Sequence, residues 1–184
     1  FMGYIRPDKV GGIVNSFKYK GLTVRVVMDW AMGHVIDNGF KGQIMGSSRN
    51  NNNAIKDAMT NSWQSANDGT KYPKYTVQSD YDYQYRNHMR WDNQIGSSES
   101  GSTNNSLYFS KGDYLAFREV SLSYMLPSTW VRKIRLSGVE VFAGAYNIGY
   151  IKKYDGMFPE IYTGVDYGVY PRPRQYNMGV KINF

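Results

Sequence analysis

The last ten residues of the chain alternate strictly between apolar side chains and polar or small ones. The apolar positions are Tyr176, Met178, Val180, Ile182 and Phe184, and the residues between them are Gln, Asn, Gly, Lys and Asn. A period of two predicts a β-strand with one apolar face. Ten residues exceed the usual strand length of about five or six and match the length that a tilted strand needs to cross a bilayer.

Four further segments repeat this alternation less strictly. They span residues 12–19, 22–30, 114–126 and 135–147. The first two are separated only by Lys20 and Gly21, which predicts a tight hairpin turn. With the final segment, the pattern predicts five antiparallel strands.

The predicted connections alternate in length. The Lys20–Gly21 turn and residues 127–133 are short, whereas residues 35–109 and 150–174 are long. Transmembrane β-barrels have this asymmetry, with short periplasmic turns and long extracellular loops. We therefore expect an all-β fold, an antiparallel segment of a transmembrane β-barrel. A soluble β-sandwich with one wet face would show the same alternation, so it remains the alternative at this point.

Five strands cannot close a bacterial barrel, which needs an even number and at least eight. Open strand edges in hydrocarbon would leave backbone groups unpaired, at several kcal/mol each. The predicted strands are therefore expected to belong to a larger barrel. The first residues, FMGYIRP, contain neither a charged region nor an apolar run, so no signal peptide is expected in this chain.

Composition argues against several other classes of protein. The chain contains no run of about 18 apolar residues, so no transmembrane helix is predicted. It also has no Cys, which excludes a disulfide framework. The net charge of +7 is spread over scattered Lys and Arg residues, so we expect no nucleic-acid partner. His34 and His88 have no neighbours at metal-ligand spacing, and no Gly-x-Ser-x-Gly elbow is present. We expect no enzyme activity, no metal and no cofactor.

Four ordered motifs resemble one protein family. They are residues 11–21, GGIVNSFKYKG; residues 111–127, KGDYLAFREVSLSYMLP; residues 139–148, VEVFAGAYNI; and residues 170–184, YPRPRQYNMGVKINF. Together they resemble the C-terminal region of SusC/RagA-type TonB-dependent outer-membrane transporters. The sequence departs from the family pattern in residues 154–160, which read YDGMFPE where the family often has G-Y-D-P-E.

The resemblance implies a 22-stranded barrel with an N-terminal plug, of which residues 1–184 would be about the last five strands. It also implies the outer membrane of a Gram-negative, Bacteroidetes-type bacterium. The whole protein would import a nutrient oligosaccharide, or a peptide, with a SusD-like surface lipoprotein and energy from the TonB complex. Phe184 resembles the C-terminal aromatic residue that serves as a barrel-insertion signal.

Aromatic residues in the two long connections are the candidate substrate-binding residues. Flat rings stack on sugar faces or peptide side chains, and Tyr hydroxyls add directional hydrogen bonds. The alternative is that the rings pack the loops together or contact the lipoprotein. A secreted β-sandwich that binds carbohydrate is the alternative function. The candidates are Trp63, Tyr72, Tyr81, Tyr83, Tyr85, Trp91, Tyr150 and Tyr154.

Overall fold

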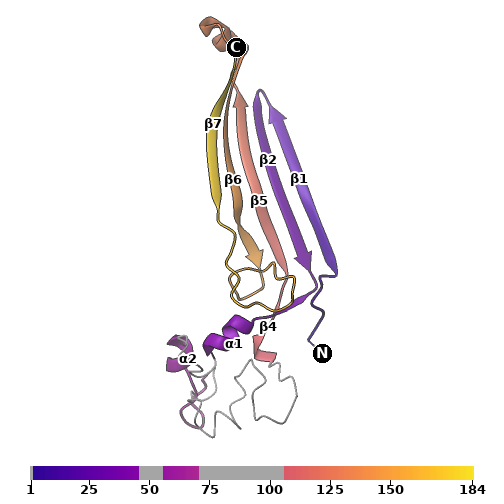
Figure 1. Cartoon of the computed structure of the whole chain (residues 1–184), viewed down its shortest axis with the longest axis vertical. Helices are drawn as coiled ribbons and strands as arrows, with labels where there is room; N and C mark the ends of the chain where they lie inside the picture. Colours follow the sequence, from indigo (N-terminus) through magenta and orange to yellow (C-terminus); the bar gives the residue numbers. More distant parts are fainter. Residues whose placement is uncertain (1, 46–55, 71–105) are drawn as a thin grey trace.

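A computed structural model describes residues 2–45, 56–70 and 106–184. Its main element is a five-stranded antiparallel sheet in which the strands lie side by side in chain order (Figure 1). The predicted all-β, antiparallel class is confirmed. The strands are β1 (Lys9–Tyr19), β2 (Leu22–Met32), β5 (Tyr114–Met125), β6 (Gly138–Lys152) and β7 (Gln175–Asn183).

The turn between β1 and β2 has the geometry that the sequence predicts. Lys20 and Gly21 have φ angles of 44° and 86°, and Tyr19 pairs directly with Leu22. Positive φ at both central residues is the requirement of a type I′ turn, whose twist matches that of the flanking strands. The two-residue connection therefore fixes the register of the hairpin.

The sheet register gives the two faces opposite chemistry. Cross-strand pairing places Val24, Leu122, Ala143 and Met178 in one row on the same face. The next row, on the other face, consists of Arg25, Ser121, Gly144 and Asn177. Because direct cross-strand partners share a face, most apolar residues of the five strands gather on one side of the sheet, although Val14, Val27 and Phe142 lie on the polar side.

The register shifts once, at Arg118. Val27 pairs with Glu119 and Met28 with Phe117, so Arg118 is an extra residue in β5. β6 adjusts at the same level, where Asn147 has a φ angle of 51°. A bulge of this kind bends the strand and redirects a side chain.

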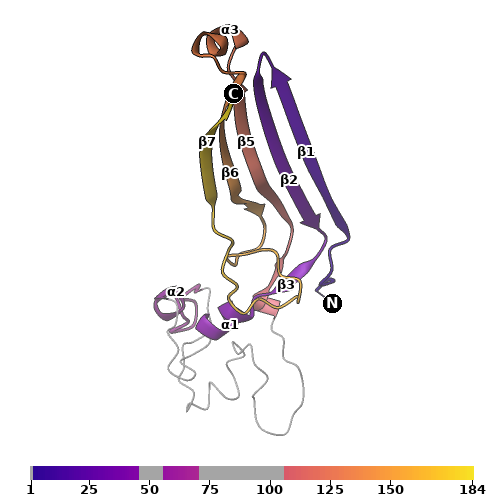
Figure 2. The same ribbon diagram turned by 45° about the horizontal axis from the view of Figure 1, so that its top comes forward.

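The two ends of the sheet carry different structures. At one end lie the ribbon of β3 (Val35–Asp37) and β4 (Phe109–Lys111), together with α1 (Gly39–Met45), α2 (Lys56–Thr60) and η3 (Ser106–Tyr108). At the opposite end, beside the C-terminus, lie α3 (Ser128–Val131) and η4 (Arg132–Ile134) (Figure 2). Within the described ranges, no helix has the length and apolar character needed to span a membrane.

Several predicted boundaries differ from the structure. The strands expected over 12–19 and 22–30 run over Lys9–Tyr19 and Leu22–Met32. The strand expected over 135–147 runs from Gly138 to Lys152, so the connection expected over 150–174 begins at residue 153. The connection expected over 35–109 contains the short elements β3, α1, α2 and η3 and the start of β4. The irregularity at Asn147 interrupts the period of two, and the alternation therefore hides the continuation of the strand.

Candidate functional site

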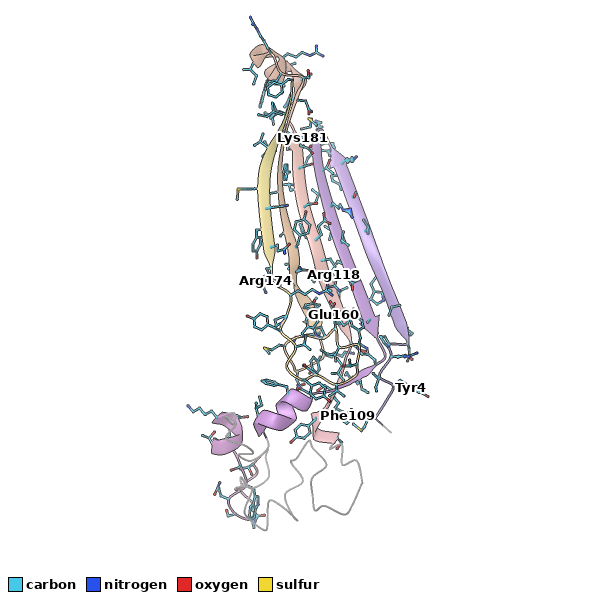
Figure 3. The ribbon with its side chains drawn as sticks, viewed as in Figure 1. Tyr4, Phe109, Arg118, Glu160, Arg174 and Lys181 are labelled. Atoms are coloured by element: carbon cyan, nitrogen blue, oxygen red, sulfur yellow. The ribbon has the colours of Figure 1, made fainter. Side chains whose placement is uncertain are left out.

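Residues 153–174 fold back over the end of the sheet that carries β3 and β4 (Figure 3). Their apolar core consists of Tyr154, Phe158 and Ile161 packed with Ile36 of β3. The Tyr150 ring on β6 packs against this core and also against a second cluster, Ala31, Tyr114 and Ala116, on the sheet. Tyr150 therefore joins the core of the loop to the polar face of the sheet.

Arg118, the bulged residue, is the centre of a polar network on this face. Its guanidinium binds both carboxylate oxygens of Asp29, with Nη2 lying 2.7 Å from Oδ2. Its Nη1 lies 2.5 Å from Oε1 of Glu160 and 3.3 Å from the Tyr150 hydroxyl. Tyr150 in turn donates to the same Glu160 oxygen at 2.8 Å. One arginine thus links β2, β5 and β6 to the loop.

Glu160 is the loop's contribution to this network. Its side chain is 1% exposed, whereas its second cationic neighbour, Arg172, is 53% exposed. Arg172 Nη2 lies 3.2 Å from Glu160 Oε2, yet that oxygen has no hydrogen bond of acceptable geometry. The contact is therefore an attraction between charges rather than a directed bond. Removing one partner of a buried ion pair costs about 3–5 kcal/mol, so the network holds the loop firmly.

Asp166 organises the far part of the loop. Its Oδ1 accepts hydrogen bonds from the backbone N–H groups of Gly168 and Val169, and its Oδ2 accepts one from the Tyr154 hydroxyl at 2.6 Å. The backbone of Asp166 bonds to Asp37 in β3. Burial and the hydrogen bond to Asp166 raise the pKa of Tyr154 well above its ordinary value, so Tyr154 remains a donor.

Asp155 connects three segments that are far apart in the sequence. Its carboxylate lies 2.5 Å from Lys41 Nζ in α1 and accepts hydrogen bonds from Ser110 Oγ at 2.8 Å and Asn38 Nδ2 at 3.3 Å. Partial burial raises the pKa of Asp155, but the bonds to Lys41, Ser110 and Asn38 outweigh it and leave the pKa below 3.8. The charged carboxylate is therefore the stable form.

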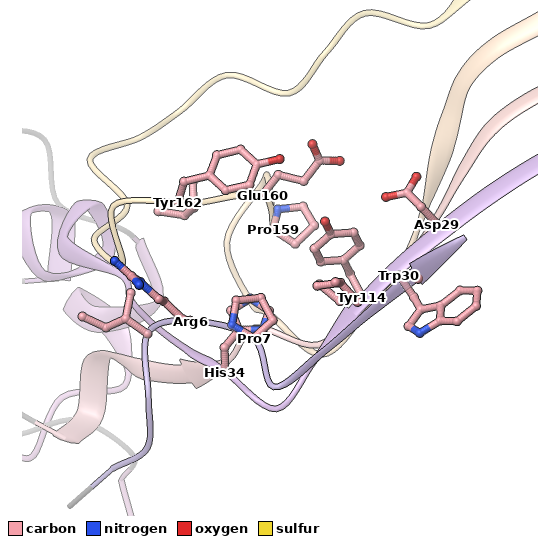
Figure 4. Close-up of a pocket in the computed structure, with 14 residues that line it drawn as sticks. Arg6, Pro7, Asp29, Trp30, His34, Tyr114, Pro159, Glu160 and Tyr162 are labelled. Atoms are coloured by element: carbon pink, nitrogen blue, oxygen red, sulfur yellow. The ribbon is translucent and has the colours of Figure 1, made fainter. Parts of the chain in front are cut away.

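A cavity of about 400 Å³ lies beside the Arg118 network (Figure 4). Its walls come from residues 5–7, the end of β2, His34, Tyr114 and the loop from Pro159 to Tyr162. In Figure 4 the carboxylates of Asp29 and Glu160 face the region around the Tyr114 ring. No group of three or more His, Asp or Glu residues suited to a metal occurs in the part of the chain that the structure describes.

The sequence-predicted binding residues fall into three groups. Tyr150 lies on β6 rather than in a loop, and Tyr154 is 2% exposed in the loop core, so Tyr154 packs the loop and offers no free ring. Trp63 is 43% exposed. The remaining five lie outside the described residues: Tyr72, Tyr81, Tyr83, Tyr85 and Trp91.

Sequence reasoning missed the Arg118 network. Arg118 and Glu160 stand 42 positions apart, and no local period joins them. The available signal was that both belong to segments quoted for the family resemblance, 111–127 and 154–160. Two residues of the family's G-Y-D-P-E pattern that remain here form ion pairs: Asp155 with Lys41 of α1, and Glu160 with Arg118.

Comparison with known proteins finds relatives along the whole chain. TonB-dependent receptor P3 of Formosa agariphila is 25% identical over 97% of this chain, and TonB-dependent receptor SusC of Bacteroides thetaiotaomicron is 26% identical over 49%. This chain spans 16% and 9% of those relatives, respectively. No family model matches.

Solved structures of RagAB share the fold. The structure of the RagAB peptide transporter superposes with a TM-score of 0.73 and 22% identity over 98% of this chain and 17% of that one. The closed-closed state of the RagAB peptide importer gives a TM-score of 0.69. These relatives are receptors and transporters rather than enzymes. The chain is therefore similar to a segment of SusC/RagA-type TonB-dependent receptors, a class of outer-membrane proteins, in sequence to P3 and SusC and in fold to RagAB.

Proposed function

We propose that residues 1–184 form about the last five strands of a 22-stranded transmembrane barrel. The observation that carries this proposal is that one sheet face is mostly apolar and the other mostly polar or small where the five strands pair. The row of Val24, Leu122, Ala143 and Met178 would meet lipid, and the row of Arg25, Ser121, Gly144 and Asn177 would meet the lumen.

The strand lengths and connections support the same placement. The five strands have 11, 11, 12, 15 and 9 residues, enough for a tilted crossing of the bilayer. Both short connections lie at one end of the sheet and both long ones at the other. The long end would be extracellular, as in other outer-membrane barrels.

A β-sandwich fits the structure less well. A sandwich buries its apolar face against a second sheet about 10 Å away. Here Phe17, Leu122 and Met178 on the apolar face are 58%, 47% and 86% exposed. Among the described residues, the other sheet is the two-stranded β3–β4 ribbon at the end of the strands. The apolar face therefore needs lipid or other protein to cover it.

The whole protein would import a nutrient oligosaccharide or peptide, with a SusD-like lipoprotein as lid and TonB as the energy source. The relatives support the class: one is named SusC, and the RagAB structures are those of a peptide transporter. Trp63, and the candidates Tyr72, Tyr81, Tyr83, Tyr85 and Trp91, remain proposed binding residues. The loop of residues 153–174 would provide a fixed extracellular wall, since Glu160 and Asp155 tie it down.

Uptake by whole cells tests the proposal. A strain lacking the gene should lose uptake of a labelled oligosaccharide or peptide, and the restored gene should recover it. Depleting TonB should abolish uptake without changing the amount of protein in the outer membrane. Uptake that persists without the gene for every substrate that supports growth would refute the import function.

A further inference from the structure

We propose that the connection between β5 and β6 binds the headgroups of anionic phospholipids at the periplasmic surface of the membrane. This inference rests on the proposed placement of the sheet in a membrane barrel and adds a lipid partner to it. The connection, residues 126–137, contains α3 and η4 and lies at the end of the sheet that has the short connections (Figure 2). The neighbouring strands β1 and β2 are joined by two residues, so the helical connection is longer than strand pairing requires.

Two tyrosines on the apolar face mark the expected headgroup level beside this connection. Tyr19 and Tyr124 lie in one cross-strand row, through Leu22, and are 58% and 37% exposed. Tyr side chains favour the membrane–water interface, because the ring is apolar and the hydroxyl is polar. α3 begins at Ser128, shortly after Tyr124, so the helical connection starts at this interface.

Val139 of β6 shows on which face of the sheet the connection packs. It pairs with Ile182 on the apolar face and is 9% exposed, whereas Ile182 is 47% and Val141 is 45% exposed. α3 contacts β6, and Val131 of α3 is 2% exposed. Packing of α3 over this end of the apolar face accounts for the burial of both valines. The connection therefore lies on the side of the sheet that would meet lipid.

Hydrogen bonds hold the connection in a fixed shape. The backbone N–H of Arg135 donates to the carbonyl of Arg132 at 3.1 Å, and that of Leu136 donates to the carbonyl of Val131 at 3.3 Å. Arg135 has a left-handed φ angle of 60°, as is common where a helix ends. The side chains between Trp130 and Arg135 are therefore presented from an ordered turn.

These side chains combine a large apolar surface with positive charge. Trp130 and Ile134 are 63% and 65% exposed, and three exposed cations stand among them and directly after them: Arg132, Lys133 and Arg135. Trp favours the membrane interface for the same reason as Tyr. The long stems of Lys and Arg let the charge reach the headgroup level while the apolar part contacts acyl chains. The surface thus matches a partner that is apolar on one side and charged on the other.

The charge of this surface calls for an anionic partner. Residues 126–139 contain no Asp or Glu, and the next acid along the chain, Glu140, is the direct cross-strand partner of Lys181. Within the described ranges, none of the three cations of the connection forms an ion pair. Basic side chains beside a membrane attract lipids of net negative charge. Anionic phospholipids are therefore favoured over zwitterionic ones at this position.

Fluorescence quenching by brominated lipids tests the site in the whole purified protein. On a background without other cysteines, Ile134→Cys carries a fluorophore at an exposed position of the connection. The protein is placed in phosphatidylcholine vesicles that contain a small fraction of brominated phosphatidylglycerol or, separately, of brominated phosphatidylcholine. One basic side chain near the surface enriches an anionic lipid about fivefold, so each brominated phosphatidylglycerol should quench about fivefold more strongly than each brominated phosphatidylcholine.

Two triple variants with the same loss of charge show whether the connection causes this preference. The first should quench equally with both lipids, and it removes the cations of the connection: Arg132→Gln, Lys133→Gln and Arg135→Gln. The second should keep the fivefold preference, and it removes three exposed cations at or beyond the opposite end of the sheet: Lys9→Gln, Lys56→Gln and Lys111→Gln. Both lipids occupy both leaflets of the vesicle, so the result does not depend on the direction of insertion.

A second label separates this inference from the barrel placement on which it rests. A fluorophore on Leu122→Cys, in the middle of the apolar face, should be quenched equally by the two lipids. Equal quenching by both lipids at position 134, as expected if an acidic periplasmic protein were the partner, would overturn the inference. So would no quenching at that position, or the same preference in both triple variants. Quenching at position 122 would then leave the barrel placement standing, whereas its absence would refute the placement itself.

Discussion

Replacing Arg118 with Met should release the loop of residues 153–174 from the sheet. Met keeps much of the length and apolar stem of Arg but removes all five N–H donors. Glu160, with a side chain 1% exposed, then loses its closest cationic partner, and Asp29, with a side chain 33% exposed, loses the guanidinium that binds it. Of the three side chains that Arg118 binds, Asp29, Tyr150 and Glu160, only Glu160 belongs to the loop, so the change removes the ion pair that ties the loop to β5.

The expected cost is about 3 kcal/mol, at the lower end of the range of about 3–5 kcal/mol for breaking a buried ion pair. Glu160 keeps the hydrogen bond from Tyr150 at 2.8 Å and the charge of Arg172 at 3.2 Å, which reduces the loss. Because 1.4 kcal/mol corresponds to a factor of ten, local opening of the loop should become roughly a hundredfold more frequent.

Hydrogen exchange measures this opening directly. In the whole protein, the amides of Asp37, Asp166 and Gly168, which are hydrogen-bonded within or to the loop, should exchange roughly a hundredfold faster in the variant. Arg25→Met is the matched control, because Arg25 pairs with Glu119 at 3.5 Å in a more exposed site on the same face. Unchanged exchange in the Arg118 variant, or an equal increase in the control, would refute the reasoning.

Three further changes have expected results. Asp155→Asn should lower the melting temperature near neutral pH, and this difference should shrink as the pH falls below 3.8, because the pKa of Asp155 is lowered in the folded chain. Tyr154→Phe should destabilise the loop by about 1–3 kcal/mol, because buried Asp166 loses a donor. Gly112→Ala should displace His34, since the new Cβ would lie 2.3 Å from its Nε2, and should lower the melting temperature.

Each of these changes has a control and a contradicting outcome. Tyr170→Phe alters an exposed side chain and should leave stability unchanged. Gly138→Ala is the control for Gly112→Ala, because the nearest atom to its new Cβ is the flexible end of Asn183, at 3.3 Å. A pH-independent effect of Asp155→Asn would contradict the role of its charge. If a variant and its control lowered stability equally, the contact removed by the variant would make no specific contribution to stability.

The strands were predictable because their signal is local. Alternation in residues such as Val24, Arg25 and Val26 follows from the strand geometry, and positive φ at Lys20 and Gly21 follows from the two-residue turn. The bulge at Arg118 was not predictable, because in the sequence an extra residue in a strand appears only as a local break in the alternation of apolar and polar residues.

The loop core and the polar network lay beyond local patterns. Tyr154, Phe158 and Ile161 have the i, i+4, i+7 spacing of a helix face, but this segment forms no helix, so local periodicity does not explain why they are buried together. The aromatic count of the loop suggested exposed rings, but Tyr154 packs inside. The pairing of Arg118 with Glu160 depends on how the loop folds back onto the sheet, which only the tertiary structure establishes.

The most direct test of the central claim is the accessibility of single cysteines in the whole protein in native outer membranes, on a background without other cysteines. Thr23, Arg25 and Ser121 on the polar face should react, once changed to Cys, with a water-soluble maleimide. Val24 and Leu122 on the apolar face should not react until detergent extraction removes the lipid. Equal reactivity of the two faces in intact membranes would contradict the account of this sheet as the wall of a membrane barrel.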